Sequence, residues 1–395
     1  MIQRHVTPFA KAALRRAALV APAIAAVAAI AVASTALYGQ SNLSSQGLGY
    51  PPGQLSTRVV GTAGALAEVD PISQVNPSAL SLVGGTILFF QIEPEFRRVS
   101  AGTATDRTTT SRYPLFAAAI PMGSRWAAGL SSATLLDRTW VTSTRDDIVI
   151  DGATVGSTIN NGSDGSINDL RLALAFTPVT WLHLGLGGHL MSGSDRVYVG
   201  RTFDSPAFGS FADTSIIGFD GGAVSAGVLA VAPRVAMAAA SFRKGGTLHA
   251  DRSDTSLGSA RVPDRLGFSL AYIGIAGTQI AARTSYEKWS ALDGLRRGNA
   301  RAVNAWDTSV GADIAGPRFA GRTLMLRAGG RWRTLPYEAT PGHKVSERSV
   351  SIGLGTVFAG GRVLSDLALT RAQRDASISV NERAWTLSIG LGVRP

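Results

Sequence analysis

The sequence predicts an all-β protein: a transmembrane antiparallel β-barrel of about 14 strands, preceded by an N-terminal hatch or plug segment. Segments of roughly ten residues with alternating hydrophobicity follow one another along the chain. Short turns alternate between them, without a break, with long polar stretches that are predicted to be loops, among them residues 145–168, 192–215 and 244–263. This is the pattern expected when tight turns lie at one rim of a barrel and large loops lie at the other.

The first 36 residues are predicted to be a signal peptide. Arg4, Lys11, Arg15 and Arg16 form a basic region without acidic residues. An alanine-rich apolar run follows it, and the small residues up to Ala36 fit a cleavage site. An uncleaved anchoring helix is the alternative interpretation of this segment.

Charge and cysteine content limit the possible functions. The full chain has 38 Lys/Arg, 27 Asp/Glu and a net charge of +11. Without the four basic residues of the signal peptide, 34 basic residues remain and the net charge is +7. Most of the arginines are distributed singly, so the basic cluster typical of nucleic-acid binding is not seen. With 0 Cys, the chain has no disulfide framework.

Residues 37–81 are predicted to form the hatch, and residues 82–395 the barrel. The predicted hatch contains the turn-forming run Gly-Tyr-Pro-Pro-Gly at 49–53, and its Gly and Pro content is too high for membrane strands. About forty residues are enough to fold into the lumen of a barrel of this size. A disordered periplasmic tail is the alternative.

The barrel strands are expected from the alternation of apolar and polar residues. In the last strand, Trp385, Leu391 and Val393 share one face, and Ala384 and Ser388 share the other. In lipid the apolar face points outward. The assignment is weakest for residues 145–168, where extra strand is the alternative to a loop. The expected strands are 86–99, 112–120, 125–144, 169–176, 181–191, 216–231, 234–243, 264–275, 279–289, 303–314, 322–333, 347–358, 362–371 and 382–393.

Two further observations support a membrane barrel. After the signal peptide, no apolar run is long enough for a membrane helix, and a closed barrel is the other structure that satisfies every backbone group in lipid. All 7 Trp residues lie near predicted strand ends, where the amphipathic ring prefers the membrane interface. Chance placement in a core is the alternative for the tryptophans.

No catalytic or metal-binding motif is recognised. Neither Gly-x-Ser-x-Gly nor His-Glu-x-x-His occurs. His183 and His189 share a face of one predicted strand, but they lie about 20 Å apart along it and cannot hold one metal ion. A lipase would need a Ser–His pair oriented by a third polar group, and nothing in the sequence identifies the serine. We therefore predict no enzyme, no cofactor and no metal.

Both ends of the predicted mature chain resemble the FadL-type outer-membrane transporter superfamily, which includes the PorV-like barrels. The N-terminal resemblance lies in a hatch motif that ends in Asn-Pro-Ser, and its residues are Arg58, Gly61, Gly64, Asp70, Asn76 and Pro77. The C-terminal third adds the runs 326–331, 353–355 and 366–369. One departure is the C-terminus, which ends Val-Arg-Pro rather than in an aromatic residue.

The resemblance implies a hatch-closed barrel of about 14 strands in the bacterial outer membrane. It also implies passive transport of hydrophobic compounds such as long-chain fatty acids. The PorV-like branch gives the alternative, a scaffold or carrier for surface or secreted proteins. A general polar porin is a third possibility, which the plug-like segment disfavours. The expected partners are outer-membrane lipid, a hydrophobic small molecule and, in the scaffold alternative, a surface protein.

Two groups of residues are candidate ligand contacts. Tyr198, Phe203, Phe208 and Phe211 lie in a polar stretch that is predicted to be an outer loop, and exposed aromatic groups often form binding surfaces. The alternative is that they pack this loop onto the barrel rim. The second group is the predicted lumen charges, which can pair with one another, hold the hatch or bind a ligand carboxylate. These charges are Arg283, Arg327, Arg331, Arg333, Asp307 and Asp313.

Overall fold

A computed structural model describes residues 49–395, apart from 102–103, 151, 254, 296–300, 320, 341 and 378–379. The predicted signal peptide and residues 37–48 of the predicted hatch lie outside the described residues. The strands are β1 (Ile87–Ala101), β2 (Ala104–Arg112), β3 (Leu115–Met122), β4 (Trp126–Asp137), β5 (Trp140–Ile150), β6 (Ala153–Val179), β7 (Leu182–Phe203), β8 (Phe211–Ala232), β9 (Ala236–Arg252), β10 (Thr255–Arg261), β11 (Arg265–Tyr272), β12 (Thr278–Glu287), β13 (Ala305–Phe319), β14 (Arg322–Thr340), β15 (His343–Phe358), β16 (Val363–Ser377) and β17 (Val380–Val393). The helices are α2 (Thr57–Gly61) and the 3-10 helices η1 (Pro77–Leu82), η2 (Trp289–Leu295) and η3 (Ala359–Gly361).

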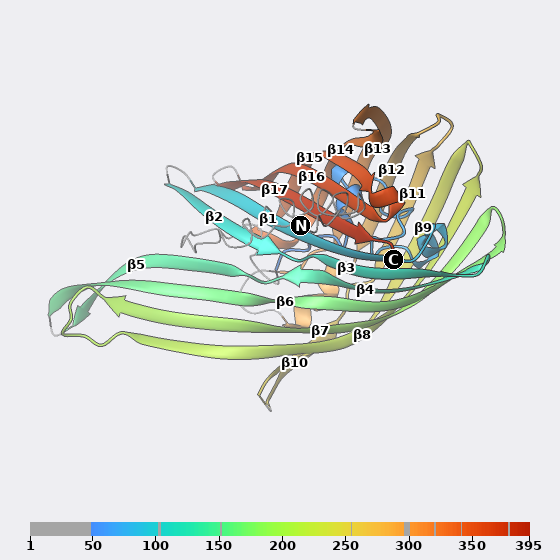
Figure 1. The fold of residues 1–395 in the computed structure, drawn as a ribbon. Coiled ribbons are helices and arrows are strands. Elements are labelled where there is room, and N and C mark those ends of the chain that lie inside the picture. The colour runs from blue at the N-terminus through green and yellow to red at the C-terminus, as the bar shows by residue number, and fades with distance from the viewer. Residues whose placement is uncertain are drawn as a thin grey trace, which may run out of the picture. The chain divides into compact units, whose positions relative to one another are not determined.

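The strands form one closed antiparallel sheet. β1 pairs with β17, from Leu88 opposite Val393 to Ala101 opposite Val380, and this pairing joins the two ends of the sheet (Figure 1). The predicted fold class is therefore confirmed. Among the described residues, no helix has the length and apolar composition needed to cross a bilayer.

The 17 strand segments correspond to 14 barrel strands, because three of the strands are interrupted. β2 and β3 both pair with β1, β4 and β5 both pair with β6, and β10 and β11 both pair with β9. Pro114 lies in the first interruption and Pro263 in the last. Proline has no N–H to donate to a strand ladder, which accounts for these two breaks.

Most of the stretches predicted as long polar loops are strand, so this part of the prediction is wrong. β6 covers most of residues 145–168, β7 and β8 cover most of 192–215, and β9 and β10 cover much of 244–263. Beyond the apolar belt both faces of a strand meet water, so the alternation fades while backbone pairing continues. For residues 145–168, the alternative of extra strand is the one that the structure shows.

The outer face of the barrel is apolar where the alternation is strong. Leu186 and Leu190 of β7 are exposed, whereas His183 and His189 on the opposite face are buried. Most of the tryptophans are also exposed on the outside, as the interface interpretation requires. Trp140 is half-buried, and Trp289 is buried at only 2% exposure because η2 carries it inward. The interface prediction is wrong for Trp289.

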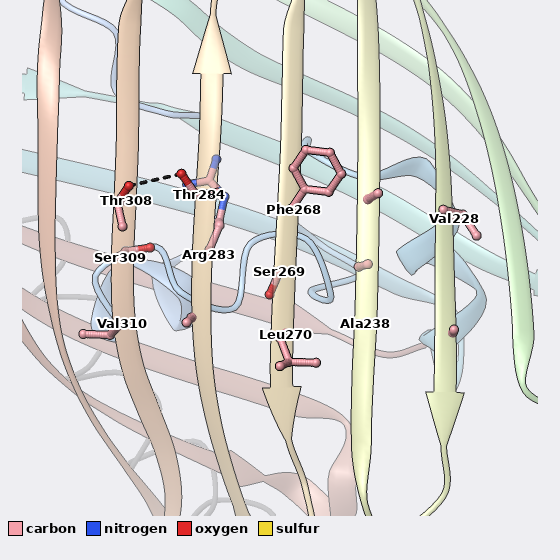
Figure 2. A pocket seen from close by; sticks show the side chains of 14 residues that line it. Val228, Ala238, Phe268, Ser269, Leu270, Arg283, Thr284, Thr308, Ser309 and Val310 are labelled. Carbon is pink, nitrogen blue, oxygen red and sulfur yellow. Dashed lines mark hydrogen bonds between the residues drawn. The ribbon is translucent and has the colours of Figure 1, made fainter.

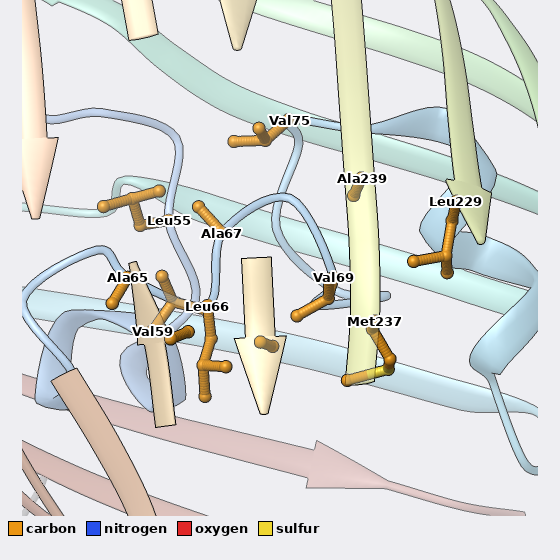
Figure 3. Close-up of a cluster of buried hydrophobic side chains, with 12 residues drawn as sticks. Leu55, Val59, Ala65, Leu66, Ala67, Val69, Val75, Leu229, Met237 and Ala239 are labelled. Atoms are coloured by element: carbon orange, nitrogen blue, oxygen red, sulfur yellow. The ribbon is translucent and has the colours of Figure 1, made fainter. Parts of the chain in front are cut away.

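The N-terminal segment, which we define as residues 49–86, lies inside the sheet. Ser56 caps α2 by accepting a hydrogen bond from the Val59 N–H. Figure 3 shows Val69 of this segment beside Met237 of β9, and both side chains are buried in one apolar cluster that also includes Leu66 and Ala239. The lumen is therefore filled by chain rather than left open.

Candidate functional site

The Asn-Pro-Ser turn of the N-terminal segment lies against two glycines of the barrel wall. The Ser78 N–H donates to the Asn76 side-chain oxygen over 3.0 Å, and Pro77 is the first residue of η1. A Cβ atom on Gly185 would lie 2.2 Å from the Ser78 nitrogen, and one on Gly227 would lie 1.9 Å from Asn76 Oδ1. The turn can reach β7 and β8 only because these wall positions have no side chain.

Two charged residues of the predicted hatch motif make different contacts. Arg58 forms an ion pair with Asp313 of β13, with an Nε–Oδ2 distance of 2.8 Å, and it donates to Gln279 of β12 over 2.7 Å. Asp70 Oδ2 accepts from both the backbone N–H and the hydroxyl of Ser73, each at 2.8 Å. Arg58 therefore fastens the N-terminal segment to the wall, and Asp70 stabilises a turn within it.

The motif glycines permit close approach and an unusual backbone. A Cβ atom on Gly61 would lie 3.2 Å from Arg327 Cδ and 3.3 Å from the Gly353 Cα. Gly64 has φ +96°, in the left-handed region that favours glycine. Both positions have a structural reason to be glycine.

Glu68 is a buried charged anchor of the N-terminal segment that sequence reasoning did not select. It forms an ion pair with Arg265 of β11, accepts from the Ser241 hydroxyl over 2.7 Å and lies 3.5 Å from Arg283 Nε. Burial by itself would raise the pKa of Glu68, but the guanidinium groups of Arg265 and Arg283 outweigh it and hold the pKa below the ordinary 4.5. Glu68 is therefore a carboxylate at neutral pH.

The predicted lumen charges are paired with one another. Asp307 accepts two hydrogen bonds of 2.7 Å from Arg331 and one of 3.0 Å from Arg283. Arg327 Nε lies 3.2 Å from Asp313, and its Nη1 pairs with a second carboxylate on β16. The alternative in which these charges pair and hold the N-terminal segment describes their observed contacts, whereas contact with a ligand carboxylate stays a prediction.

Tyr50 is a second anchor that sequence reasoning missed. Its backbone N–H donates to the Asp137 carbonyl over 2.7 Å, and the Asp137 N–H donates back over 2.8 Å. Its hydroxyl accepts from Arg374 over 2.9 Å and also from Arg333. Four guanidinium groups surround the ring at 4.6 to 6.0 Å from its centroid, those of Arg97, Arg112, Arg333 and Arg374. The sequence carries no signal for this cluster, because its members come from distant strands.

The predicted aromatic ligand contacts lie at the outer ends of β7 and β8. The Phe203 and Phe208 rings have centroids 5.7 Å apart, and Phe208 lies in the connection between the two strands. Phe211 begins β8 and is 54% exposed. Tyr198 lies apart from these three on the opposite face of β7, where its ring covers Gly162 of β6. The three phenylalanines therefore share a region that Tyr198 does not.

Two hollows in the described part of the chain each have a volume of several hundred Å³. One, of about 460 Å³, lies on the short-turn side and is bounded by residues such as Ile72, Phe89 and Asp313. The other is a shallow apolar hollow of about 600 Å³ across β8 to β13 (Figure 2). Its outward lining includes Phe268, Leu270 and Val310. Among the described residues, no group of three or more His, Asp or Glu side chains is placed to hold a metal ion.

The fold is similar to that of FadL-type barrels. No protein-family model matches the sequence, and no curated protein matches it significantly. A Pseudomonas aeruginosa FadL homologue superimposes with a TM-score of 0.60 at 13% identity, over 88% of this chain and 99% of that chain. The P. putida toluene transporter TodX gives 0.56 at 13% identity, over 87% and 99%. The Ralstonia pickettii toluene transporter TbuX gives 0.54 at 13% identity, over 87% and 98%.

Proposed function

We propose that this FadL-type barrel is a passive channel for hydrophobic compounds in the bacterial outer membrane. The observation that carries the proposal is the lumen filled by an N-terminal segment that is held by ion pairs and apolar contacts. Such a segment blocks a continuous water-filled pore, which a general porin would need. It can also shift without breaking a covalent bond, so a ligand can pass when it moves.

The proposed route begins at the outer ends of β7 and β8. Phe203, Phe208 and Phe211 offer aromatic surface to an apolar molecule. Further in, a buried apolar cluster that includes Met191 and Trp289 lines the part of the lumen nearer the outer strand ends, which we call the upper lumen. The ligand then passes the N-terminal segment and leaves through the hollow on the short-turn side. Each stage presents apolar side chains, which supports an apolar ligand over a sugar.

The proposed ligand class includes long-chain fatty acids and small aromatic hydrocarbons. The first follows from the sequence resemblance. The second is supported by TodX and TbuX, which are described as toluene transporters and share the fold. The proposed transport needs no cofactor, because passage down a concentration gradient requires no chemical step.

Uptake by a bacterial host that lacks its own channels of this type tests the proposal. Radiolabelled toluene and radiolabelled oleate would be offered to cells that carry the full chain or an empty vector. Faster uptake of either compound supports the channel and identifies the preferred class. A folded, heat-modifiable barrel that accelerates neither compound would refute it. Liposome swelling with sugars is the control, because rapid sugar entry would indicate a porin instead.

A further inference from the structure

Three adjacent strands of the lumen wall bring together an aspartate, a histidine and a serine. Nδ1 of His189 on β7 lies 2.8 Å from Oδ1 of Asp169 on β6. Nε2 of the same ring lies 2.9 Å from the hydroxyl oxygen of Ser225 on β8. All three side chains are buried. The sequence did not reveal this arrangement, because the three residues belong to three separate strands.

The hydrogen bonds fix the roles of the two ring nitrogens. An ionised carboxylate only accepts hydrogen bonds, so the neutral His189 ring carries its proton on Nδ1, beside Asp169. Nε2 is then an acceptor, and the Ser225 hydroxyl donates to it. This is the order in which a serine nucleophile, a general base and an orienting carboxylate act in acyl transfer.

Two buried arginines flank the serine and have unused hydrogen-bond donors. Arg243 is directly opposite Ser225 in the ladder between β8 and β9, and its Nε and Nη2 have no hydrogen-bond partner among the described residues. Within the same part of the chain, Arg171 Nε and Nη1 also have no partner. A Cβ atom on Gly187 would lie 2.6 Å from Ser225 Oγ and 3.4 Å from Arg171 Cδ, so the arginine stem and the hydroxyl lie close to the same point. Donors of this kind stabilise an oxyanion.

The surroundings of the triad fit an apolar substrate. Ile167, Met191 and Ala223 occupy the next inward-facing positions toward the outer ends of their strands. Ile167 and Met191 belong to the apolar cluster of the upper lumen, and Ala223 packs against it. On the other side, Gln54 of the N-terminal segment donates to Asp169 over 2.9 Å, and Gln74 donates to the carbonyl of the same residue over 2.8 Å. The N-terminal segment therefore covers the triad while it occupies the lumen.

We propose that Ser225, His189 and Asp169 form a hydrolytic centre for hydrophobic carboxylic esters that enter the lumen. Ser225 Oγ bonds to the ester carbonyl carbon, and its proton passes to His189 Nε2. The carbonyl oxygen becomes the oxyanion that Arg171 and Arg243 stabilise. The bond to the alkoxy oxygen breaks, and the leaving alcohol takes the proton from His189.

Water completes the cycle. It loses a proton to His189 Nε2 and attacks the acyl-serine, which releases the carboxylic acid and returns the proton to Ser225 Oγ. Each turnover consumes one ester and one water and yields one alcohol and one acid. The ester reaches Ser225 only when the N-terminal segment moves, so this proposal rests on the opening proposed for the channel.

The experiment uses the full chain purified in detergent. An alkyl fluorophosphonate probe should label Ser225, located by peptide mass spectrometry, and p-nitrophenyl octanoate should be hydrolysed. Ser225→Ala and His189→Gln should each abolish labelling at this position. Asp169 is a positioning residue, so Asp169→Asn should lower kcat by at least about 100-fold because the ring loses its orientation, and Asp169→Glu should restore part of it.

Ser309→Ala is the matched control, because Ser309 is another buried serine of the described lumen wall and its hydroxyl has no partner. This variant should be labelled at Ser225 like the wild type. Toluene has no ester, so its uptake reports opening of the channel independently. A wild-type chain that takes up toluene but is not labelled at Ser225 overturns the hydrolytic centre alone. A folded chain that is not labelled at Ser225 and that takes up neither toluene nor oleate overturns the channel as well.

Discussion

Gly227 of β8 faces Asn76 of the N-terminal segment so closely that a Cβ atom on the glycine would lie 1.9 Å from Asn76 Oδ1. Gly227→Val should therefore displace η1 from the wall and loosen the N-terminal segment. We expect faster toluene uptake, and a loss of about 1–3 kcal/mol in unfolding free energy from overpacking. Gly188→Val on β7 is the control, because a Cβ atom there would meet no atom of the described residues within 4 Å. Equal uptake by the two variants would contradict the closure role of this contact.

Tyr50 should hold the start of the N-terminal segment in place. Tyr50→Ala removes the ring from among four guanidinium groups and should cost about 3–5 kcal/mol of stability, the range for truncating a large buried aromatic residue. Tyr50→Phe keeps the ring but removes the acceptor for Arg333 and Arg374, so a smaller loss of about 1–3 kcal/mol is expected. Thermal unfolding in detergent measures both changes. Tyr50→Ala should unfold at the lowest temperature, Tyr50→Phe at an intermediate one and the wild type at the highest. Any other order of unfolding temperatures counts against the anchoring role of Tyr50.

The sequence predicts the membrane part of this fold well and the lumen contacts poorly, for physical reasons. The alternation of Leu186 and Leu190 with buried histidines reflects lipid on one side of a strand, which is a local property of the chain. The contacts of Tyr50 and Glu68 depend on strands that are distant in sequence, so no local sequence pattern predicts them. Paired arginines and aspartates such as Arg331 and Asp307 can be predicted in part. The alternation of side chains along a strand predicts that they face the lumen, but which residues pair depends on the register between strands.

A reversible cross-link can test whether the N-terminal segment must move. The Thr57 and Ser388 hydroxyl oxygens lie 3.0 Å apart, between α2 and β17, and the chain has 0 Cys. Thr57→Cys with Ser388→Cys should form a disulfide, which requires Cβ atoms about 3.5–4.5 Å apart. We expect the oxidised protein to lose most toluene uptake, and a reductant to restore it. Each single cysteine variant is the control. Undiminished uptake by the fully oxidised pair would show that passage does not require this part of the segment to move.

Glu68 should make the closure sensitive to acid. Its pKa is below 4.5 in the folded protein, so its ion pairs contribute fully above that pH and are lost as pH falls through the lowered folded value. The N-terminal segment should therefore become more accessible to cleavage by an added protease as the pH falls well below 4.5. Glu68→Gln should cost about 3–5 kcal/mol at neutral pH, because Arg265 and Arg283 lose their buried partner.

The acid response of the variant is the decisive comparison for Glu68. Without an ionisable group at this position, Glu68→Gln should lose this part of the pH dependence. Glu287→Gln is the matched control. Glu287 Oε1 also lies 3.6 Å from Arg265 Nε, but the Glu287 side chain is 23% exposed. Its effect should be within about 1 kcal/mol. If Glu287→Gln releases the segment as readily as Glu68→Gln, the closure does not depend on the buried pair.

The three outer phenylalanines should matter for capture of the ligand rather than for folding. The triple substitution to Ser at Phe203, Phe208 and Phe211 removes aromatic surface that lies beyond the apolar belt. Toluene uptake should fall by about tenfold at low concentration, since about 1.4 kcal/mol of lost binding energy corresponds to one power of ten. At saturating toluene the rate should recover, because passage through the lumen is unchanged. Tyr198→Ser is the control, since Tyr198 lies on the opposite face of β7. Heat-modifiable mobility on a gel confirms that the barrel is intact, and an intact triple variant with wild-type uptake at low toluene would assign these rings to packing of the barrel rim.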